Sequence, residues 1–90
     1  MSFVRDLVWD DWNVEHVGRH SVKPEEVEEV SFSEPFITRA RGRTLRAIGQ
    51  TQAGRYLTVI LAPRGRGSYY PVTAREASEG EQRLYRKRRE

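Results

Sequence analysis

Two absences stand out in this sequence of 90 residues: it has no cysteine, and its central stretch has no acidic residue. Without cysteine, a disulfide framework, a thiolate metal site and a thiol nucleophile are excluded. No stretch approaches the roughly 18 apolar residues of a membrane helix, and the N-terminus lacks the basic and apolar regions of a secretory signal. We therefore expect a cytoplasmic protein of one domain, residues 1–90, with one core and a shallow surface site.

The net charge of +3 conceals a strong separation of charge along the chain. Residues 1–34 contain nine acidic and three basic residues, giving −6, and residues 76–90 contain four acidic and five basic residues, giving +1. Residues 35–75 contain eight arginines and no other charged residue. Because guanidinium groups bind phosphate bidentately and stack on bases, this stretch favours binding of a polyanion, RNA above all, on one face.

Helix signals occur at three places in the chain. Asp10 and Asp11 are good N-caps for a helix over about residues 12–20. Pro24 suits the first turn of a second helix, because its missing N–H would be unpaired there, and Pro35 ends that helical region. Ser78 opens an S-x-x-E capping box, which predicts a third helix from that residue, with the tail 86–90 frayed.

Strand signals fill most of the remaining chain. Residues 56–62 are almost continuously apolar, which is typical of a central strand, and Pro71 indicates an edge position or a bulge. Residues 63–67 are expected to form a flexible basic loop. The predicted strands cover residues 3–9, 36–41, 44–50, 56–62 and 68–74.

The sequence therefore predicts an α+β fold in which a twisted antiparallel sheet packs on one face against two N-terminal helices and one C-terminal helix. The order is strand, two helices, four strands and a helix. The expected core consists of Trp9, Val14, Val17, Val27, Val30, Leu57, Val59, Leu61 and Leu84.

Few residue patterns point to a particular chemistry. His16 and His20 have the four-residue spacing of metal ligands on a helix, but Val17 stands where the protease motif has glutamate, and no third histidine exists. We therefore predict no metal site and no cofactor. Tyr69 and Tyr70 could stack on unpaired bases, although strand alternation leaves at most one of them free.

The order of several short motifs resembles the BrnT family of type II toxins. The first are Trp9-Asp10, Asn13-x-x-His16-x-x-Arg19-His20 and the run from Pro24 to Val30, and the rest are residues 46–51, 54–59 and 72–75 and Ser78-x-x-Glu81-x-x-x-Tyr85. The resemblance covers nearly the whole chain. It implies a RelE-like fold, a bacterial, metal-independent ribonuclease that inhibits translation, and a co-encoded antitoxin that neutralises it.

The resemblance also selects candidate site residues. His20 is a candidate general base, Arg46 and Arg75 would hold the phosphate, and Tyr70 is a possible acid or stacking group. The further candidates for RNA binding are Arg39, Arg41, Arg43, Arg64 and Arg66.

Three departures from the family pattern keep a second interpretation open. Ser21 stands where the family usually has glycine, Arg43-Thr44 stands where it commonly has a Glu-Arg pair, and Tyr70 stands where many members have arginine. The alternative is a non-catalytic module of the same fold that binds RNA or an acidic protein.

Overall fold

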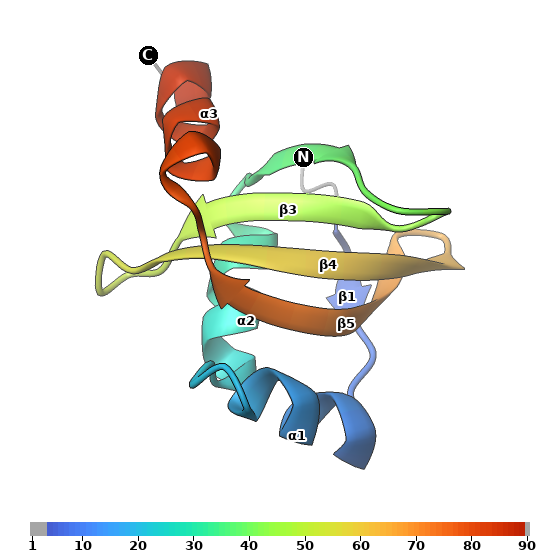
Figure 1. Ribbon diagram of the computed structural model, residues 1–90. Coiled ribbons are helices and arrows are strands. Elements are labelled where there is room, and N and C mark those ends of the chain that lie inside the picture. Colours follow the sequence, from blue (N-terminus) through green and yellow to red (C-terminus); the bar gives the residue numbers. More distant parts are fainter. Residues whose placement is uncertain (1–3, 90) are drawn as a thin grey trace.

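The computed structural model describes residues 4–89 and has the expected α+β architecture (Figure 1). Two helices follow the first strand, and a third helix closes the chain, as predicted. The elements are β1 (Asp6–Leu7), α1 (Asp11–Gly18), α2 (Pro24–Phe32), β2 (Phe36–Arg39), β3 (Leu45–Gln50), β4 (Tyr56–Gly65), β5 (Ser68–Glu76) and α3 (Glu79–Arg89).

The sheet is mixed rather than wholly antiparallel, which corrects the prediction. Its strand order is β1-β5-β4-β3-β2, and β1 pairs with β5 in parallel, with Asp6 opposite Ser68 and Leu7 opposite Tyr69. Hairpin connections make the other four strands antiparallel, whereas the long connection from β1 to β5 permits a parallel pair. The predicted central strand is confirmed, since β4 lies between β3 and β5.

The hairpins differ from the predicted boundaries. β2 ends at Arg39 because the chain turns at Arg41, whose carbonyl accepts hydrogen bonds from the backbone N–H and the hydroxyl of Thr44. The expected loop over residues 63–67 is wrong, because β4 and β5 continue to a two-residue turn at Arg66 and Gly67. Both turn residues have positive φ, as a tight hairpin turn of this kind requires.

A bulge interrupts β5 beside its proline, as predicted. Ile60 is opposite Thr73 across the β4–β5 ladder. Leu61 is opposite Pro71, so Val72 is an extra residue without a partner. The missing N–H of proline is tolerated here because β1 pairs only with Ser68 and Tyr69 of β5.

The N-terminal strand and the first helix are shorter than predicted. Strand pairing begins at Asp6, and Phe3 lies outside the described residues. α1 begins one residue early and ends at Gly18. Its predicted N-cap, Asp10, is confirmed, because the carboxylate accepts a hydrogen bond from the backbone N–H of Asn13.

The main core lies between the sheet and the first two helices. Six of the predicted core residues have no exposed surface: Val17, Val27, Val30, Leu57, Val59 and Leu61. Trp9 is partly buried against them. The prediction that Val14 and Leu84 belong to the core is wrong, because 42% and 41% of their surface is exposed. α1 buries Asn13 and Val17 instead, and α3 buries Glu81 and Tyr85, each pair being one helical turn apart.

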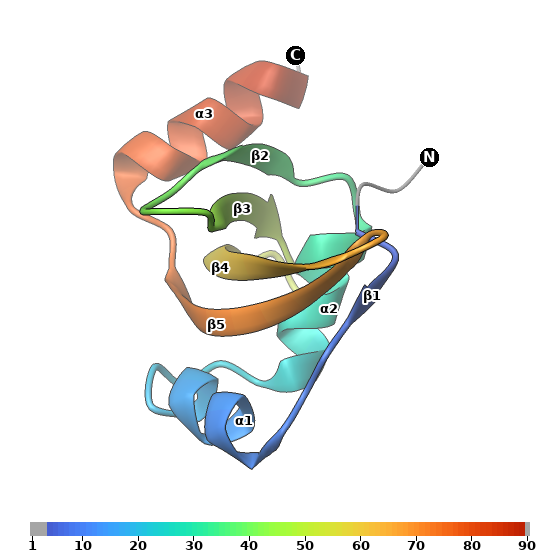
Figure 2. The ribbon, with the colours of Figure 1, turned by 90° about the vertical axis from the view of Figure 1, so that its right-hand side faces the viewer.

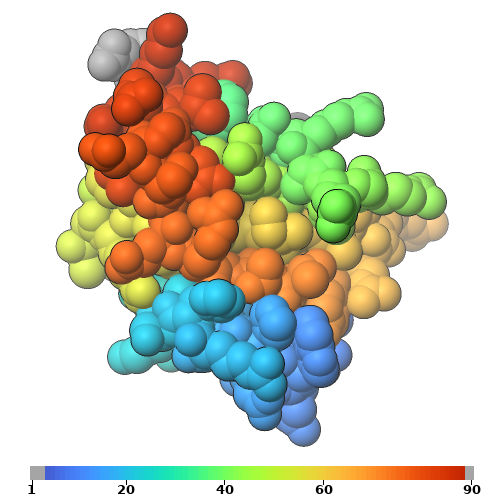
Figure 3. Space-filling view, viewed as in Figure 1, coloured from blue at the N-terminus to red at the C-terminus, as the bar shows by residue number. Residues whose placement is uncertain are grey.

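The helices lie on both faces of the sheet, which corrects the prediction that they pack on one face. α2 covers one face across β3 and β4, α1 lies along β5, and α3 lies on the other face near β2 and β3 (Figure 2). The predicted capping box at Ser78 is confirmed. Residues 86–89 are helical, so the expected fraying is wrong there, and Glu90 lies outside the described residues. Part of the sheet remains uncovered between α3 and α1 (Figure 3).

Candidate nucleic-acid interface

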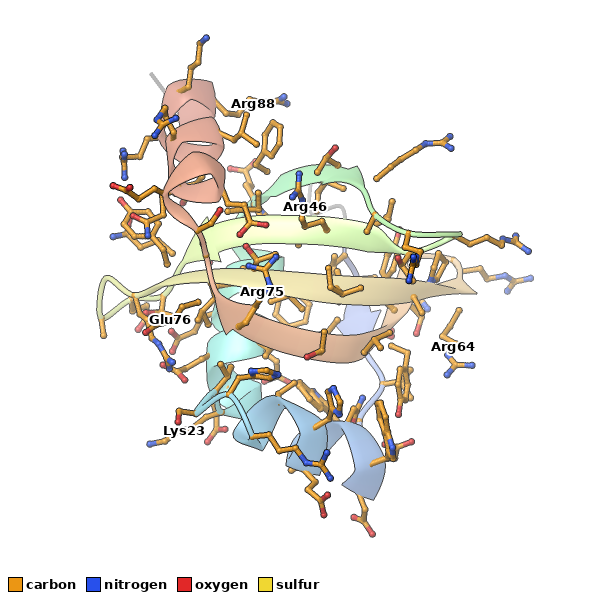
Figure 4. The ribbon with its side chains drawn as sticks, in the orientation of Figure 1. Lys23, Arg46, Arg64, Arg75, Glu76 and Arg88 are labelled. Carbon is orange, nitrogen blue, oxygen red and sulfur yellow. The ribbon has the colours of Figure 1, made fainter. Side chains whose placement is uncertain are left out.

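The two arginines expected to hold phosphate lie on the same face of the sheet. Arg75 of β5 is opposite Thr58 of β4, and Arg46 lies on the neighbouring strand β3. Side chains alternate along each strand, and this register directs all three toward the face that carries α3. Figure 4 shows the side chains of Arg46 and Arg75 below the start of α3.

Glu81 of α3 joins these residues into one ionic cluster. Arg75 donates two hydrogen bonds to the carboxylate, at 2.7 and 2.9 Å, and Arg46 donates one at 3.1 Å. The Thr58 hydroxyl donates a further bond at 2.9 Å, and so does the backbone N–H of Ser78. The hydrogen bonds of the cluster therefore satisfy the acceptor oxygens of the carboxylate and fasten the first turn of α3 to three strands.

The cluster is electrostatically strong but not neutral. The hydrogen bonds from Arg75 lower the pKa of Glu81 to about 2, and the carboxylate in turn raises the pKa of Arg75. Two guanidinium groups against one carboxylate leave one net positive charge. The buried Nε of Arg46 has no hydrogen-bond partner in the described part of the chain. The net positive charge of the cluster is available to attract an anion.

His20 lies in the turn that follows α1 and is not bonded to the cluster. Its ring meets His16 edge-on with the centroids 6.2 Å apart, and His16 stacks on Trp12 at 4.6 Å. No hydrogen bond between residues 4 and 89 joins His20 to Arg46 or Arg75. Within the same residues no group of three potential metal ligands occurs.

Tyr70 is likewise outside the cluster. Its hydroxyl donates to both carboxylate oxygens of Asp10, at 2.9 and 3.0 Å, and the Arg64 guanidinium lies 4.7 Å from the ring centroid. Partial burial and the bond to the Asp10 carboxylate raise the pKa of Tyr70, which makes it a weaker acid. It links β5 to the N-terminus of α1.

The other candidate arginines lie at one end of the sheet but in two groups. The first is on the β2–β3 hairpin and the second on the β4–β5 hairpin, on opposite sides of the sheet end (Figures 1 and 2). A shallow pocket of about 260 Å³ is lined by Arg39, Gly42, Arg43, Thr44 and Leu45. Within residues 4–89, no ion pair involves Arg39, Arg41, Arg43, Arg64 or Arg66.

The arginines do not share the single face that the charge distribution suggested. Arg55, at the other end of the sheet, binds the Glu26 carboxylate at 3.0 Å and the Ser21 carbonyl at 2.8 Å. It also lies 3.5 Å from the Glu76 carboxylate. Arg55 therefore fixes the β3–β4 turn to α2 and the end of β5.

Sequence reasoning missed Glu81 and Thr58 as members of the site. The S-x-x-E pattern did identify Glu81, but only as a helix cap. Its partners Arg46 and Thr58 lie 35 and 23 residues away. A local pattern gives no signal of contacts over such separations.

Comparison with known proteins identifies the fold. No family model and no curated protein matches the sequence. Among solved structures, the chain is similar to the Brucella abortus ribonuclease toxin BrnT, with a TM-score of 0.67 and 19% sequence identity. The match covers 82% of this chain and 97% of the toxin chain.

This chain has the BrnT fold. Because 82% of this chain and 97% of the BrnT chain are matched, the likeness extends over most of the architecture rather than one motif. The predicted resemblance to BrnT is therefore confirmed at the level of the fold, while the RelE-like assignment stays a prediction. No helix between residues 4 and 89 is long and apolar enough to span a membrane.

Proposed function

We propose that this protein is the toxin of a bacterial type II toxin–antitoxin system and acts in the cytoplasm as a ribonuclease that inhibits translation. The observation that carries the proposal is the match to 97% of the chain of a ribonuclease toxin. The net positive Arg46–Glu81–Arg75 cluster beside an uncovered sheet face adds a chemical reason, because RNA is a polyanion.

The proposed reaction is attack of a ribose 2′-hydroxyl on the adjacent phosphorus. A bond forms between the 2′-oxygen and phosphorus, and the bond to the 5′-oxygen breaks, leaving a 2′,3′-cyclic phosphate and a 5′-hydroxyl. His20 takes the 2′ proton, and solvent supplies the proton to the leaving oxygen. Arg46 and Arg75 stabilise the additional charge on the phosphoryl oxygens.

The rate enhancements that such groups usually contribute are sufficient for a toxin of modest catalytic activity. Acid–base catalysis contributes about 10²–10⁴-fold, and one charge-stabilising donor about 10²–10³-fold. The Glu81 carboxylate holds both guanidinium groups in a fixed position, so little reorganisation accompanies the reaction. The proposed mechanism uses side chains and solvent only.

The proposal includes a co-encoded antitoxin as the protein partner. A basic surface free of ion pairs offers such a partner an electrostatic docking site, and the β2–β3 hairpin supplies one through Arg39, Arg41 and Arg43. Because RNA would approach the same positive surface, a bound antitoxin would compete with RNA.

A second candidate function is RNA binding without cleavage, in a module of the same fold. Two contacts favour it. Glu81 already occupies the hydrogen-bonding edge of Arg75, and the Tyr70 hydroxyl is bonded to Asp10 rather than to the cluster.

Alanine variants of the three proposed catalytic residues test the function. His20→Ala, Arg46→Ala and Arg75→Ala are compared with His16→Ala, from the helix that precedes His20, and Arg55→Ala, an arginine paired with acids at the far end of the sheet. Growth after induced expression and cleavage of RNA are measured on variants whose circular dichroism shows a folded chain. We expect both activities to fall together, by about 10²-fold or more, in at least two of the three variants and not in the controls.

The result can also contradict the proposal. If all three folded variants remain as toxic as the parent, the site lies elsewhere. If the parent binds RNA but neither cleaves it nor inhibits growth, the non-catalytic function is correct.

A further inference from the structure

The solvent-facing side of α3 carries a row of cations. Arg83, Arg86 and Lys87 are exposed, and none forms an ion pair with any residue between 4 and 89. The helix contains five basic and two acidic residues, and one of the acids, Glu81, is already occupied by two sheet arginines. The outward surface of α3 is therefore strongly positive.

The cations stand on a rigid support. Glu81 anchors the first turn of α3, and Tyr85 is buried one turn later with its ring edge-on to Tyr56. The Arg86 guanidinium lies 5.8 Å from the Tyr56 ring centroid. Because the helix is anchored and the Arg86 side chain is already partly ordered, binding a ligand costs less conformational entropy than it would on a frayed tail.

The position of α3 places this charge next to the proposed cleavage site. The helix begins at the Arg46–Glu81–Arg75 cluster and extends away from the uncovered sheet face (Figures 3 and 4). From Glu81 to Arg88 the axis rises about 10 Å, which is enough for more than one backbone phosphate. Arg88 turns toward the sheet and lies 6.0 Å from the Phe36 ring centroid.

We propose that the outward cations of α3, namely Arg83, Arg86 and Lys87, bind the phosphate backbone of single-stranded RNA that extends from the cluster. The inference deepens the proposed function and rests on it for the nature of the ligand. Phosphate is favoured over an acidic protein because the row stands on the helix that begins at the net positive cluster, and because arginine forms bidentate bonds with phosphate.

The test compares two variants with the same change of charge. In the first, Arg83, Arg86 and Lys87 are replaced by glutamine, which has a similar helix propensity. In the second, Arg5, Arg19 and Lys23, exposed cations of the N-terminal segment, are replaced by glutamine. The probe is a labelled single-stranded 2′-O-methyl oligoribonucleotide, which lacks the nucleophile for cleavage, titrated from 0.05 to 0.4 M salt.

Loss of three phosphate contacts reduces the salt-dependence slope by about 2 and weakens binding by about a hundredfold at 0.1 M salt. We expect this in the α3 variant and not in the control. Equal losses in both variants, or no loss in the α3 variant, would overturn the inference. So would weaker binding of polyglutamate with unchanged binding of the oligonucleotide, which would indicate an acidic protein ligand.

Cleavage of unmodified RNA is measured in parallel, so the two proposals can fail separately. A parent that binds the modified RNA through α3 but cuts no RNA contradicts the ribonuclease function alone. If the α3 variant cuts RNA as well as the parent does at low RNA concentration, only the inference about α3 is contradicted.

Discussion

Among single residues, Glu81 links the chemistry of the site to the stability of the fold. Its side chain is 6% exposed and accepts hydrogen bonds from two arginines, a threonine and a backbone amide. These donors favour the charged carboxylate, which is why its pKa falls to about 2. The same bonds position Arg46 and Arg75.

The low pKa of Glu81 predicts a loss of stability in acid. Because the folded-state pKa lies below the ordinary value of 4.5, the contribution is present above about pH 4.5 and is lost as the pH falls toward 2. It amounts to about 3 kcal/mol at most, since solvent screens the exposed side of Arg75. Urea unfolding of Glu81→Gln should show a deficit at pH 7 that shrinks at pH 3, whereas a constant deficit would contradict the prediction.

Tyr70 gives a second titration that can be checked. Partial burial and its bond to Asp10 raise its pKa, so its phenol should ionise above pH 10 in ultraviolet titration. Asp10→Asn removes the negative charge and should return the pKa of Tyr70 toward 10. The difference between the parent and Tyr70→Phe isolates its signal from those of the other tyrosines. An unchanged titration in Asp10→Asn would show that the carboxylate has no influence.

At the level of residues, the sequence predicted what depends on near neighbours. The Asp10 cap and the Ser78–Glu81 capping box involve residues three positions apart and were correctly identified. The ion pairs of Glu81 with Arg46 and Arg75 depend on strand register and on the docking of α3. Neither is encoded locally, so Arg46 and Arg75 could be proposed as members of a site but not as partners of Glu81.

Among the elements, α2 and β3 make an unusually close contact at a glycine. A Cβ added to Gly49 would lie 3.0 Å from Cγ1 of Val30 and 3.5 Å from Cβ of Pro35. Val30 is fully buried, so it has little freedom to move. We expect Gly49→Ala to destabilise the protein by about 1–3 kcal/mol in chemical denaturation.

The matched control is a glycine in open space. Gly18 ends α1, and a Cβ there would meet nothing within 4 Å. Gly18→Ala should be neutral or stabilise by up to about 1 kcal/mol, because alanine favours the helix. Equal effects of the two substitutions would show that packing against α2 is not the cause.

Among the elements, apolar runs predicted the central strand reliably, whereas amphipathic spacing predicted the buried faces of the helices less reliably. The 56–62 run identified β4, and the helices appeared at their caps. Val14 and Leu84 were misjudged because short helices can turn either of two stripes toward the sheet. In α3 the stripe that packs contains Glu81, which sequence reasoning excludes from a core unless its arginine partners are known.

For the whole molecule, the separation of charge along the sequence becomes a separation in space. Acidic residues of α1 and α2 lie on one side, and the unpaired arginines lie at the sheet end and along α3. The overall class was predictable because helix and strand signals occur in separate blocks. The parallel pairing of β1 was not predictable, since a two-residue strand leaves no periodic signal and its partner β5 is distant in the sequence.

The charge separation predicts electrostatically steered association with the proposed antitoxin. Arg39→Glu combined with Arg41→Glu should slow association about tenfold or more at low salt and flatten its salt dependence. The control, Arg19→Glu with Lys23→Glu, makes the same change of charge beside the acidic helices α1 and α2. Stopped-flow association rates measure both. If salt leaves the association rate of the parent unchanged, steering plays no part.

The bulge at Val72 sets the phase of β5. Side chains alternate along a strand, so if the same residues paired without a bulge, Tyr69 would share a face with Thr73 and Arg75, and Tyr70 would point into the core. With the bulge, Tyr69 packs against the core and Tyr70 reaches Asp10. Deleting Val72 would remove the bulge and leave both tyrosines on their present faces, because Pro71 and Tyr70 already pair with Leu61 and Ala62. The link between β5 and the start of α1 thus depends on leaving one residue of the strand unpaired, and not only on the identity of the tyrosine.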